Sequence, residues 1–493
     1  MNQSTLLEVN GLSVKEAGRF ILNDISFTIS EGECWAFSGP SGCGKTSLLK
    51  RICNYKLFPG NISFRKADPK VILIPHQYFF KDKTGSSNFY YQQRFNSPEA
   101  DVTETVMDDL MSEGLSDKQA INYLSQLQVS YISDRPLIQL SNGEKKRYQI
   151  AKAISKKPEW LLLDEPFTGL DKESRQLLTN ILSKLIKNGI RIIIVTTGEL
   201  PSFVTHVATV NHGILNDIFD RDSVLEKNYY DNTRVSSFIN EIPEPCEIFP
   251  ADCIIHMDNV HVAYNRKEVL RGINWDVYAG EKWCISGPNG SGKSTLLSLI
   301  TGDHPQAFAS DVYMFGKKRG SGETIWEIKK QIGFLSPELH QYFNKSFTVF
   351  DTVASGLFDT IGLFKKLSKS QIETVNKYLR YFSLNGDSKK FLRMLPNGRQ
   401  RWVLLARAFV KNPPILILDE PCQGLDDEMS KQFLHFIETV CSGSARTLLY
   451  VSHLQKEIPE CIDNSITLNE GKIIEIKKHG KAINSYFRRR NRA

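Results

Sequence analysis

Gly39-Pro40-Ser41-Gly42-Cys43-Gly44-Lys45-Thr46 fits the pattern G-x-x-x-x-G-K-[ST], and Gly287-Pro288-Asn289-Gly290-Ser291-Gly292-Lys293-Ser294 repeats it. Glycine lets a backbone wrap closely around phosphate oxygens and turn successive N–H groups inward. Each copy follows an apolar run and precedes a helical pattern. Strand, glycine-rich loop and helix, in that order, predict a phosphate-binding P-loop with a helix dipole behind it.

The two loops define the first predicted binding residues. Lys45 and Lys293 are expected to reach the β- and γ-phosphates of a nucleotide, while Thr46 and Ser294 are expected to ligate Mg²⁺. The predicted nucleotide-binding set also takes in the residue that follows each motif, and it comprises Gly39, Pro40, Ser41, Gly42, Cys43, Gly44, Lys45, Thr46, Ser47, Gly287, Pro288, Asn289, Gly290, Ser291, Gly292, Lys293, Ser294 and Thr295.

The chain is a tandem repeat. Lys293 lies 248 residues after Lys45, whereas the LLLDEP and LILDEP motifs place Asp419 255 residues after Asp164. The second copy therefore carries seven more residues between these landmarks. We expect a first domain over residues 1–222, a linker over 223–250 and a second domain over 251–493. The prolines of 242–246 favour an extended, semi-rigid linker.

Local patterns predict the elements around the motifs. Leu6–Val9 and Ile25–Ile29 alternate in polarity, which favours antiparallel strands. Lys70–Pro75 is a near-continuous apolar run, typical of a buried parallel strand. Residues 98–135 are expected to be mostly helical, with Thr103 or Asp117 as helix caps.

Composition excludes several classes of protein. The hydrophobic share of 41% is sufficient for full cores, and no apolar run approaches the roughly 18 to 20 residues that cross a bilayer. Met1–Thr5 lacks the pattern of a signal peptide. The nine cysteines form no C-x-x-C, so we expect reduced thiols in a cytoplasmic protein. A net charge of +7 does not by itself indicate nucleic acid; the basic run Arg488–Arg492 is either a solvated tail or a contact to RNA or anionic lipid.

Five motifs follow one another in the first half: a P-loop, Gln77 after a strand, L-S-x-G-E, a strand ending in Asp-Glu, and G-L-D; the second half repeats the P-loop, the Asp-Glu strand end and G-L-D in the same order. This set resembles the ATP-binding cassette (ABC) ATPases over nearly the whole chain. The runs Arg401–Ala408 and Leu416–Asp426 resemble, more narrowly, the two-cassette ATP-binding proteins of the ModF type. The resemblance implies an α/β fold with two P-loop cassettes, each with a mostly parallel core sheet, an antiparallel β subdomain and a helical subdomain.

The resemblance also implies how the motifs would work together. Two cassettes close head to tail around two ATP molecules and Mg²⁺, and each site takes its L-S-x-G-E segment from the opposite cassette. Asp164, Asp419 and Gln77 would hold or sense Mg²⁺, and Glu165 and Glu420 would polarise the attacking water. The segments that would face the γ-phosphates contribute Ser141, Gly143, Glu144, Asn397 and Gly398.

The two composite sites are unequal. We call site B the one built on the second P-loop and Glu420, faced by Ser141. Tyr264 stands where the family stacks an aromatic ring on adenine, and His453 stands at the position of the switch histidine. Site B lacks a Gln equivalent to Gln77, and Ser336, Glu338 and Gln341 remain open as substitutes.

Site A uses the first P-loop, Gln77 and Glu165, and departs more often from the pattern. Thr197 replaces the switch histidine, and Glu16 aligns with Tyr264. Pro396 replaces the facing serine, which removes a hydroxyl and an N–H, although Arg399 could supply a contact to phosphate. We therefore expect site B to turn over ATP and site A to bind it more statically; hydrolysis at both sites is the alternative.

Three roles are compatible with this ATPase. It could energise a separate membrane permease from the inner face of the membrane, with a molybdate-type substrate suggested only by the subgroup name. It could act on the ribosome or nucleic acid, which the short linker and the lack of an N-terminal iron–sulfur cysteine cluster disfavour. It could be a nucleotide-gated scaffold. The aromatic-rich stretch 79–95 is either a partner surface or internal packing.

Overall fold

A computed structural model of the chain gives the fold. It describes residues 5–16, 19–58, 60–76, 104–137, 140–197, 200–221, 242–245, 253–264, 267–452, 454 and 457–478. The chain divides into two compact units, and each holds one copy of the same plan. The boundaries of the domains at 222 and 250 stay a prediction.

A six-stranded sheet forms the centre of each unit. In the first unit the strands lie in the order β5-β6-β7-β3-β8-β9, and their bounds are β3 (Trp35–Ser38), β5 (Val71–Ile74), β6 (Trp160–Asp164), β7 (Arg191–Val195), β8 (His206–Asn211) and β9 (Ile214–Asp220). In the second unit the order is β15-β16-β17-β12-β18-β19, with β12 (Lys282–Ser286), β15 (Ile332–Leu335), β16 (Ile415–Asp419), β17 (Thr447–Val451), β18 (Asn464–Asn469) and β19 (Lys472–Lys478). All neighbours pair in parallel except the last strand of each sheet.

A smaller antiparallel sheet accompanies each core sheet. Its strands are β1 (Thr5–Glu16), β2 (Arg19–Ser30) and β4 (Ile62–Phe64) in the first unit, and β10 (Cys253–Tyr264), β11 (Lys267–Tyr278), β13 (Val312–Met314) and β14 (Lys317–Lys318) in the second. The two long hairpins share one register, because Glu16 pairs with Arg19 as Tyr264 pairs with Lys267, 248 residues later. The structure therefore confirms that Glu16 and Tyr264 are equivalent positions.

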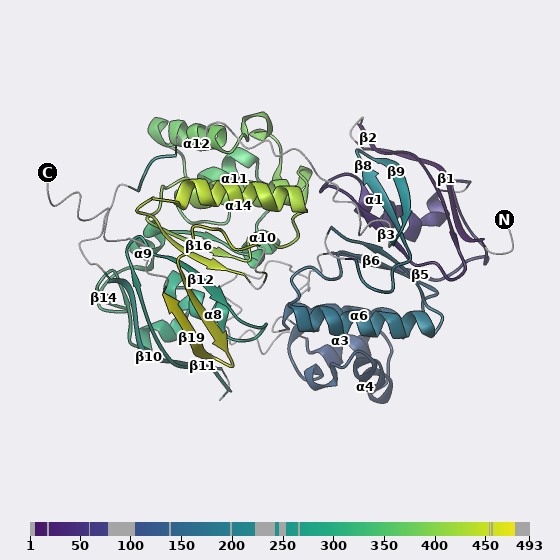
Figure 1. Ribbon diagram of the computed structural model, residues 1–493, viewed down its shortest axis with the longest axis horizontal. Helices are drawn as coiled ribbons and strands as arrows, with labels where there is room; N and C mark the ends of the chain where they lie inside the picture. Colours follow the sequence, from purple (N-terminus) through teal and green to yellow (C-terminus); the bar gives the residue numbers. More distant parts are fainter. Residues whose placement is uncertain are drawn as a thin grey trace. The chain divides into compact units, whose positions relative to one another are not determined.

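The helices fall into a P-loop helix, a helical subdomain and a helix after the Asp-Glu strand. In the first unit they are α1 (Lys45–Cys53), α3 (Val106–Ser112), α4 (Asp117–Gln126), α5 (Asn142–Ser155) and α6 (Lys172–Lys187). In the second they are α8 (Lys293–Thr301), α9 (Ile325–Gln331), α10 (Pro337–Tyr342), α11 (Val349–Ser355), α12 (Lys369–Tyr381), α13 (Asn397–Phe409) and α14 (Asp427–Cys441). Figure 1 shows α6 running beside the sheet that contains β6, and α14 beside the sheet that contains β16.

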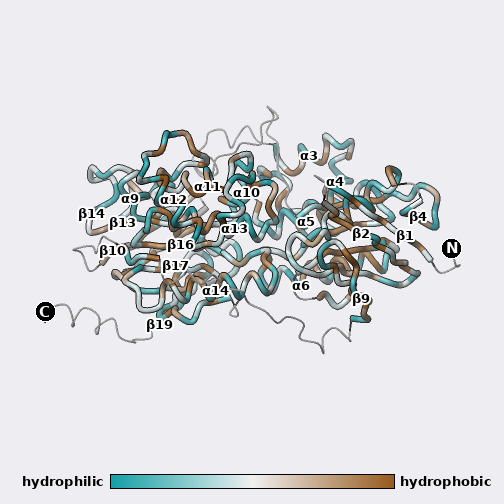
Figure 2. The backbone as a smooth tube through the Cα atoms, turned by 90° about the horizontal axis from the view of Figure 1, so that it is seen from above, coloured by the Kyte–Doolittle hydropathy of each residue, from teal (hydrophilic) through white to brown (hydrophobic). Residues whose placement is uncertain are grey.

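Hydrophobic residues concentrate in the core strands, as the hydropathy colouring of Figure 2 shows. Leu161 and Leu163 of β6 pack with Leu182 of α6 in one cluster, and all three are fully buried. Because β6 is buried along its whole length, its apolar run is continuous, and its acidic residues come only at its carboxyl end. The mostly parallel sheet, the antiparallel β subdomain and the helical subdomain are all confirmed.

Three local predictions need correction or lie out of reach. The strand in Lys70–Pro75 is β5, but it lies at the sheet edge and only Ile74 of its residues is fully buried. Asp117 is not a cap: Ser116 caps α4, because its side chain can accept from the third helical N–H while Asp117 already has helical geometry. Thr103 lies outside the described residues, and the cap of α3 is Thr105.

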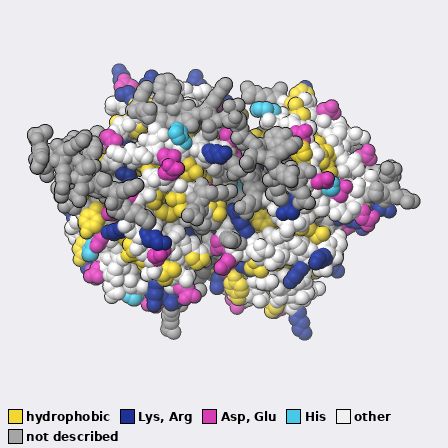
Figure 3. Space-filling view, viewed as in Figure 1, with side chains coloured by type: hydrophobic (Ala, Val, Ile, Leu, Met, Phe, Trp, Pro, Cys, Tyr) yellow, Lys and Arg dark blue, Asp and Glu magenta, His cyan; other side chains and the backbone are white. Residues whose placement is uncertain are grey.

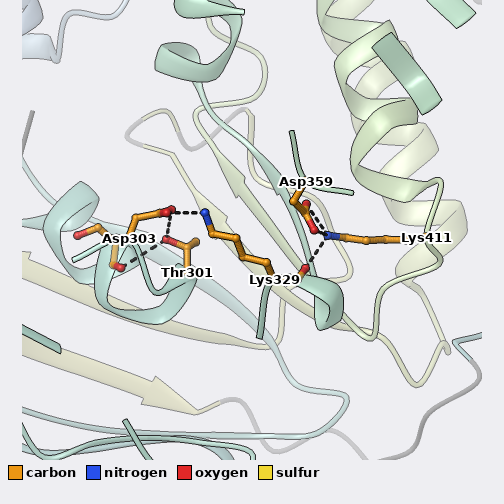
Figure 4. A network of polar contacts seen from close by, with 6 residues as sticks. Thr301, Asp303, Lys329, Asp359 and Lys411 are labelled. Atoms are coloured by element: carbon orange, nitrogen blue, oxygen red, sulfur yellow. Dashed lines mark hydrogen bonds and ion pairs between the residues drawn. The ribbon is translucent and has the colours of Figure 1, made fainter. Parts of the chain in front are cut away.

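In the second unit, partly buried ion pairs connect the core to the helical subdomain. Figure 4 shows Lys329 of α9 beside Asp303, at 2.6 Å, and Lys411 beside Asp359. Lys411 also donates to the carbonyl oxygen of Lys329, so the two pairs form one network. A cavity of about 90 Å³ lies next to it, lined by Asp303, Lys329, Asp359 and other residues of both subdomains. The position of the helical subdomain is therefore fixed by charges as well as by apolar contacts.

The described part of the linker, 242–245, contacts the second unit. The Glu244 carboxylate accepts hydrogen bonds from the Ser444 hydroxyl at 2.8 Å and from the Ala445 N–H at 3.2 Å. The Arg446 guanidinium donates to the Pro243 carbonyl oxygen. All cysteines within the described ranges are free thiols, as expected. Among the helices described, none has the length and apolar composition to cross a membrane.

Candidate functional site

Parallel strand order brings the predicted motifs of the first unit to one edge. Strand β3 lies between β7 and β8, and β6 lies beside β7. The loop after β3, the acids at the end of β6 and Thr197 after β7 therefore meet at the carboxyl ends of these strands, where open α/β sheets bind ligands. The strand order of the second unit is the same, with β12, β16 and β17 in these places.

The first loop can be built only with glycine at its turning points. Gly39 has a φ of 141°, and a Cβ there would lie 2.0 Å from the carbonyl oxygen of Val210. Gly44 has a φ of 109°, and its Cβ would lie 2.7 Å from the Ile21 carbonyl oxygen. Backbone cannot yield as a side chain can, so any other residue would open the loop.

The second loop repeats this geometry. Gly287 has a φ of 144°, and a Cβ there would lie 2.2 Å from the Leu468 carbonyl oxygen. The Ser291 hydroxyl is buried and has no hydrogen-bond partner within the described ranges. A buried hydroxyl without a partner is unfavourable unless a ligand satisfies it, and a phosphate oxygen would do so.

Each loop lysine lies across its own loop. Lys45 donates from Nζ to the carbonyl oxygens of Gly39 at 2.6 Å and Pro40 at 2.8 Å. Lys293 donates to Gly287 at 2.8 Å and to Pro288 at 2.9 Å. Both ammonium groups are thus held inside the loop that would wrap the phosphates. The remaining predicted residues lie in the loops and in the helices that follow them. Ser41, Gly42 and Cys43 lie between β3 and α1, and Thr46 and Ser47 lie in the first turn of α1. Asn289, Gly290 and Gly292 lie between β12 and α8, and Ser294 and Thr295 lie in the first turn of α8.

The first unit has a donor set that fits Mg²⁺. The Thr46 hydroxyl donates to Asp164 Oδ2 at 2.9 Å. The other oxygen, Oδ1, is buried and lacks a partner among the described residues. Mg²⁺ is usually held by one or two carboxylates together with substrate phosphates, rather than by an all-protein cage. Among the described residues, no three acidic, His or Cys side chains lie together as a metal-binding group.

Glu165 has a strained backbone, and its side chain is partly buried. Its φ of 49° is left-handed, and its N–H is tied to the Val195 carbonyl oxygen at 2.9 Å. Its Oε2 accepts from the Thr197 N–H at 3.3 Å and from the Thr168 hydroxyl at 3.4 Å. Burial raises the pKa of Glu165 to about 7, against the nearby Lys45 ammonium, which lowers it. Strained backbone of this kind clusters at functional sites.

The second unit has the same strained turn. Glu420 has a φ of 41°, and its N–H donates to the Val451 carbonyl oxygen at 3.0 Å. The Gln423 amide donates to Glu420 Oε2 at 3.0 Å. Burial, and then the charges of Glu338 and Glu420, raise the pKa of Asp419 well above its ordinary value. A cation bound beside Asp419 would favour the ionised carboxylate and so lower this pKa.

The structure narrows the candidates for the missing Gln of the second unit. Ser336 caps α10 by accepting from the Leu339 N–H at 3.1 Å, and it is almost fully buried. Glu338, in the first turn of α10, is near enough to Asp419 for its charge to act on that carboxyl. It also lines the cavity beside the ion-pair network. Among the three candidates, Glu338 is therefore the one whose charge raises the pKa of Asp419.

The two L-S-x-G-E segments start their helices differently. Ser141 is the N-cap of α5 and forms a capping box with Glu144: its hydroxyl accepts from the Glu144 N–H at 3.3 Å, and its own N–H donates to Glu144 Oε2 at 2.9 Å. Pro396 is the N-cap of α13 and has no side-chain cap. Gly143 and Gly398 lie in the first turns of the two helices.

The Arg399 side chain forms hydrogen bonds within its own unit. Its Nε lies 3.1 Å from Asp387 Oδ2, and its terminal nitrogen donates to the Ser383 carbonyl oxygen. Arg399 is thus paired within its own unit, and its contact to phosphate stays a prediction. Asn397 begins α13, and its role remains a prediction.

Several predicted residues cannot be placed. Gln77 and His453 lie outside the described residues, as do the aromatic stretch 79–95 and the basic run Arg488–Arg492. Tyr264 ends strand β10, but its side chain is not described.

Two P-loops, each at the carboxyl edge of a parallel sheet beside an Asp-Glu strand end, define the class as a P-loop nucleotide hydrolase with two cassettes. The family model for the ABC transporter ATP-binding domain matches residues 22–168 and again 270–423. The chain therefore belongs to the ABC ATPase family, and it is an ATPase with two cassettes in one chain.

Relatives with the same layout are found in bacteria and yeasts. The chain is 33% identical over 468 residues to the ABC transporter ATP-binding protein ModF of Escherichia coli, covering 91% of this chain and 95% of that one. It is 29% identical to an uncharacterised ABC transporter ATP-binding protein of Schizosaccharomyces pombe, covering 92% and 96%. A solved structure of cbiO1 from Clostridium perfringens, part of an ABC transporter complex, matches 49% of this chain and 94% of its own at 24% identity, with a TM-score of 0.40.

Proposed function

We propose that the two cassettes close head to tail around two ATP molecules, and that site B hydrolyses ATP while site A holds it. The observation that carries this proposal is the contrast between the helix starts that would face the two nucleotides. Ser141 offers a hydroxyl in a capped first turn of α5, whereas Pro396 offers neither a hydroxyl nor an N–H. The γ-phosphate in site B would gain a donor that the one in site A lacks.

In site B the chain supplies each step of phosphoryl transfer to water. The Gly287–Ser294 loop and Lys293 bind the phosphates, and Ser294 with Asp419 would hold Mg²⁺, which neutralises charge on the β- and γ-phosphates. Glu420 orients a water molecule towards the γ-phosphorus and takes its proton. The water oxygen bonds to phosphorus, the bond to the ADP oxygen breaks, and phosphate leaves with ADP.

Site A keeps the binding parts and loses parts needed for turnover. Thr197 stands at the switch position, and it contacts Glu165 through its backbone N–H. The facing residue is Pro396, and Arg399 forms an ion pair with Asp387. Binding through the Gly39–Thr46 loop needs none of these groups, so ATP would stay bound there and keep the cassettes together.

The cellular role we favour is to energise a separate membrane permease from the inner face of the membrane. Relatives that share this two-cassette layout are named transporter ATP-binding proteins. The alternative is a ribosome or nucleic-acid factor. On the face that Figure 3 shows, the basic and acidic side chains of the described residues are interspersed, whereas a nucleic-acid footprint is a cluster of basic side chains. A nucleotide-gated scaffold is the third role, and it would require little turnover at either site.

The test compares two substitutions that remove the same group. Glu420→Gln should abolish most steady-state ATPase activity, whereas Glu165→Gln should leave most of it, with both variants still binding ATP. Equal losses from the two variants would refute the asymmetry. ATP-trapped Glu420→Gln protein should then copurify with membranes and a permease; copurification with ribosomes would support the alternative role, and copurification with neither would support the scaffold.

A further inference from the structure

Lys146 and Arg401 are buried cations at equivalent positions of the two signature helices. Each lies three residues after the glycine of its motif, Gly143 or Gly398, and the two are 255 residues apart. Both side chains are almost entirely removed from solvent. Burying a charge is costly unless several acceptors compensate it, so the identity of those acceptors is informative.

Arg401 binds the turn that holds Glu420. From Nη1 it donates to the carbonyl oxygens of Glu420 at 3.0 Å and Pro421 at 2.9 Å, and from Nη2 it donates to Gln423 Oε1 at 3.3 Å. The guanidinium thus binds a turn whose first residue, Glu420, is in the left-handed region, with a φ of 41°. We call these three hydrogen bonds of Arg401 the clasp. The planar guanidinium has five donors in a fixed fork, which suits three acceptors spread along one turn.

Gln423 connects Arg401 to the carboxylate of Glu420 through hydrogen bonds. An arginine can only donate, so the amide of Gln423 must present its oxygen to Arg401. Its NH₂ group then points to Glu420, and Nε2 lies 3.0 Å from Glu420 Oε2. Arg401 thereby selects one of the two orientations of the amide, and that orientation is the one that can hold the carboxylate.

The first unit uses the same position for a different contact. Lys146 donates to the carbonyl oxygens of Pro75 at 3.3 Å and His76 at 3.1 Å, directly before Gln77. At the place of Gln423 stands Thr168, whose shorter side chain reaches Glu165 Oε2 at 3.4 Å. The clasp on the turn and the hydrogen bonds of the Gln423 amide are therefore both made by residues that only the second unit has at these positions.

We propose that Arg401 is a positioning residue which, through Gln423, fixes the carboxylate of Glu420 for attack on ATP. This proposal rests on the function proposed above, in which Glu420 acts at site B. The hydrogen bonds of Arg401 and Gln423 run to the turn and side chain of Glu420, so in this proposal both residues act through Glu420. The clasp therefore affects the rate of the chemical step and leaves the binding of ATP unchanged.

The test uses the full-length protein and three single variants. Arg401→Lys keeps the charge but loses the fork, and Gln423→Met keeps the length of the side chain but loses the amide. Arg407→Lys is the matched control, because Arg407 is also a buried arginine on α13 but donates to Ser355 and Thr360 of the helical subdomain. Steady-state kinetics give kcat and KM for ATP, and thermal unfolding gives Tm.

Arg401→Lys and Gln423→Met should each lower kcat by about tenfold to a hundredfold, as groups that orient a catalytic ligand do, with KM within about twofold. The double variant should lose no more than the worse single variant, because both act through one contact. In a Glu420→Gln background neither change should lower the residual rate further. Arg407→Lys should keep the wild-type kcat even if its Tm falls.

Two results would overturn the proposal in different ways. If Glu420→Gln lowers kcat but Arg401→Lys and Gln423→Met do not, or if their losses multiply in the double variant, the clasp does not position Glu420. If Glu420→Gln itself leaves kcat unchanged, the proposed role of site B fails, and the positioning role fails with it.

Discussion

Replacing Ser141 with alanine separates a structural cap from a contact to phosphate. The hydroxyl of Ser141 accepts from the Glu144 N–H at 3.3 Å, and Ser141→Ala removes this bond while its own N–H can still donate to Glu144 Oε2. If the hydroxyl also donates to the γ-phosphate in site B, the substitution removes a second hydrogen bond, and that one exists only with nucleotide bound.

The two losses have different magnitudes and different observables. Loss of an N-cap costs about 1 kcal/mol, which shifts the Tm of a unit of roughly 200 residues by about 2–4 °C. Loss of a hydrogen bond to a charged group costs about 1.5–3 kcal/mol, or roughly a 10- to 150-fold lower kcat/KM for ATP. The first loss appears in thermal unfolding without nucleotide, and the second in ATPase kinetics at 25 °C.

Ser116→Ala is the matched control. Ser116 caps α4 in the same unit with the same capping box, made with Gln119, but it belongs to none of the predicted site motifs. Both variants should show a similar fall in Tm, and only Ser141→Ala should lose activity. Equal activities in the two variants would refute the contact of Ser141 to phosphate and, with it, the reason for preferring site B.

Three further predictions test other parts of the structure. Gly287→Ala should abolish nucleotide binding at the second loop in a fluorescent-nucleotide titration, because its Cβ would lie 2.2 Å from the Leu468 carbonyl oxygen; retained affinity would contradict the loop geometry. Burial lowers the pKa of His304 from its ordinary 6.5 to about 4, so its contribution to stability is complete above pH 6.5 and is lost as the pH falls towards 4; His304→Asn should flatten the fall of Tm over this range, and an unchanged slope would count against it. Glu244→Ala should speed proteolytic cleavage near residue 244, because it removes the bond to Ser444, and an unchanged rate would show that this bond does not hold the linker.

The sequence predicted what depends on short patterns. At Gly39 and Gly287 a neighbouring backbone carbonyl group leaves no room for a Cβ atom, so both loops need glycine there. This requirement makes the P-loops recognisable from the sequence. The parallel strand at β6 followed from its apolar run and terminal acids. The cap of α4 was misjudged by one residue, because Ser116 and Asp117 are both good capping types and only backbone geometry separates them.

Contacts between distant segments could not be predicted in this way. The bond from Thr197 to Glu165 depends on the pairing of β6 with β7, and the pair of Arg399 with Asp387 depends on packing within the helical subdomain. The clasp of Arg401 on the Glu420 turn is similar. Its only sequence signal is a cation three residues after the motif glycine, and lysine at the same place in the first unit binds elsewhere.

We expect one of the two bound ATP molecules to be hydrolysed and the other to be retained. A single-turnover experiment with radiolabelled ATP, in which bound ATP and ADP are counted per chain over time, distinguishes the two sites. Half of the bound ATP should convert to ADP in a fast phase while the other half persists, and Glu420→Gln should remove the fast phase. Conversion of both molecules at one rate, or a fast phase that survives Glu420→Gln, would contradict this expectation.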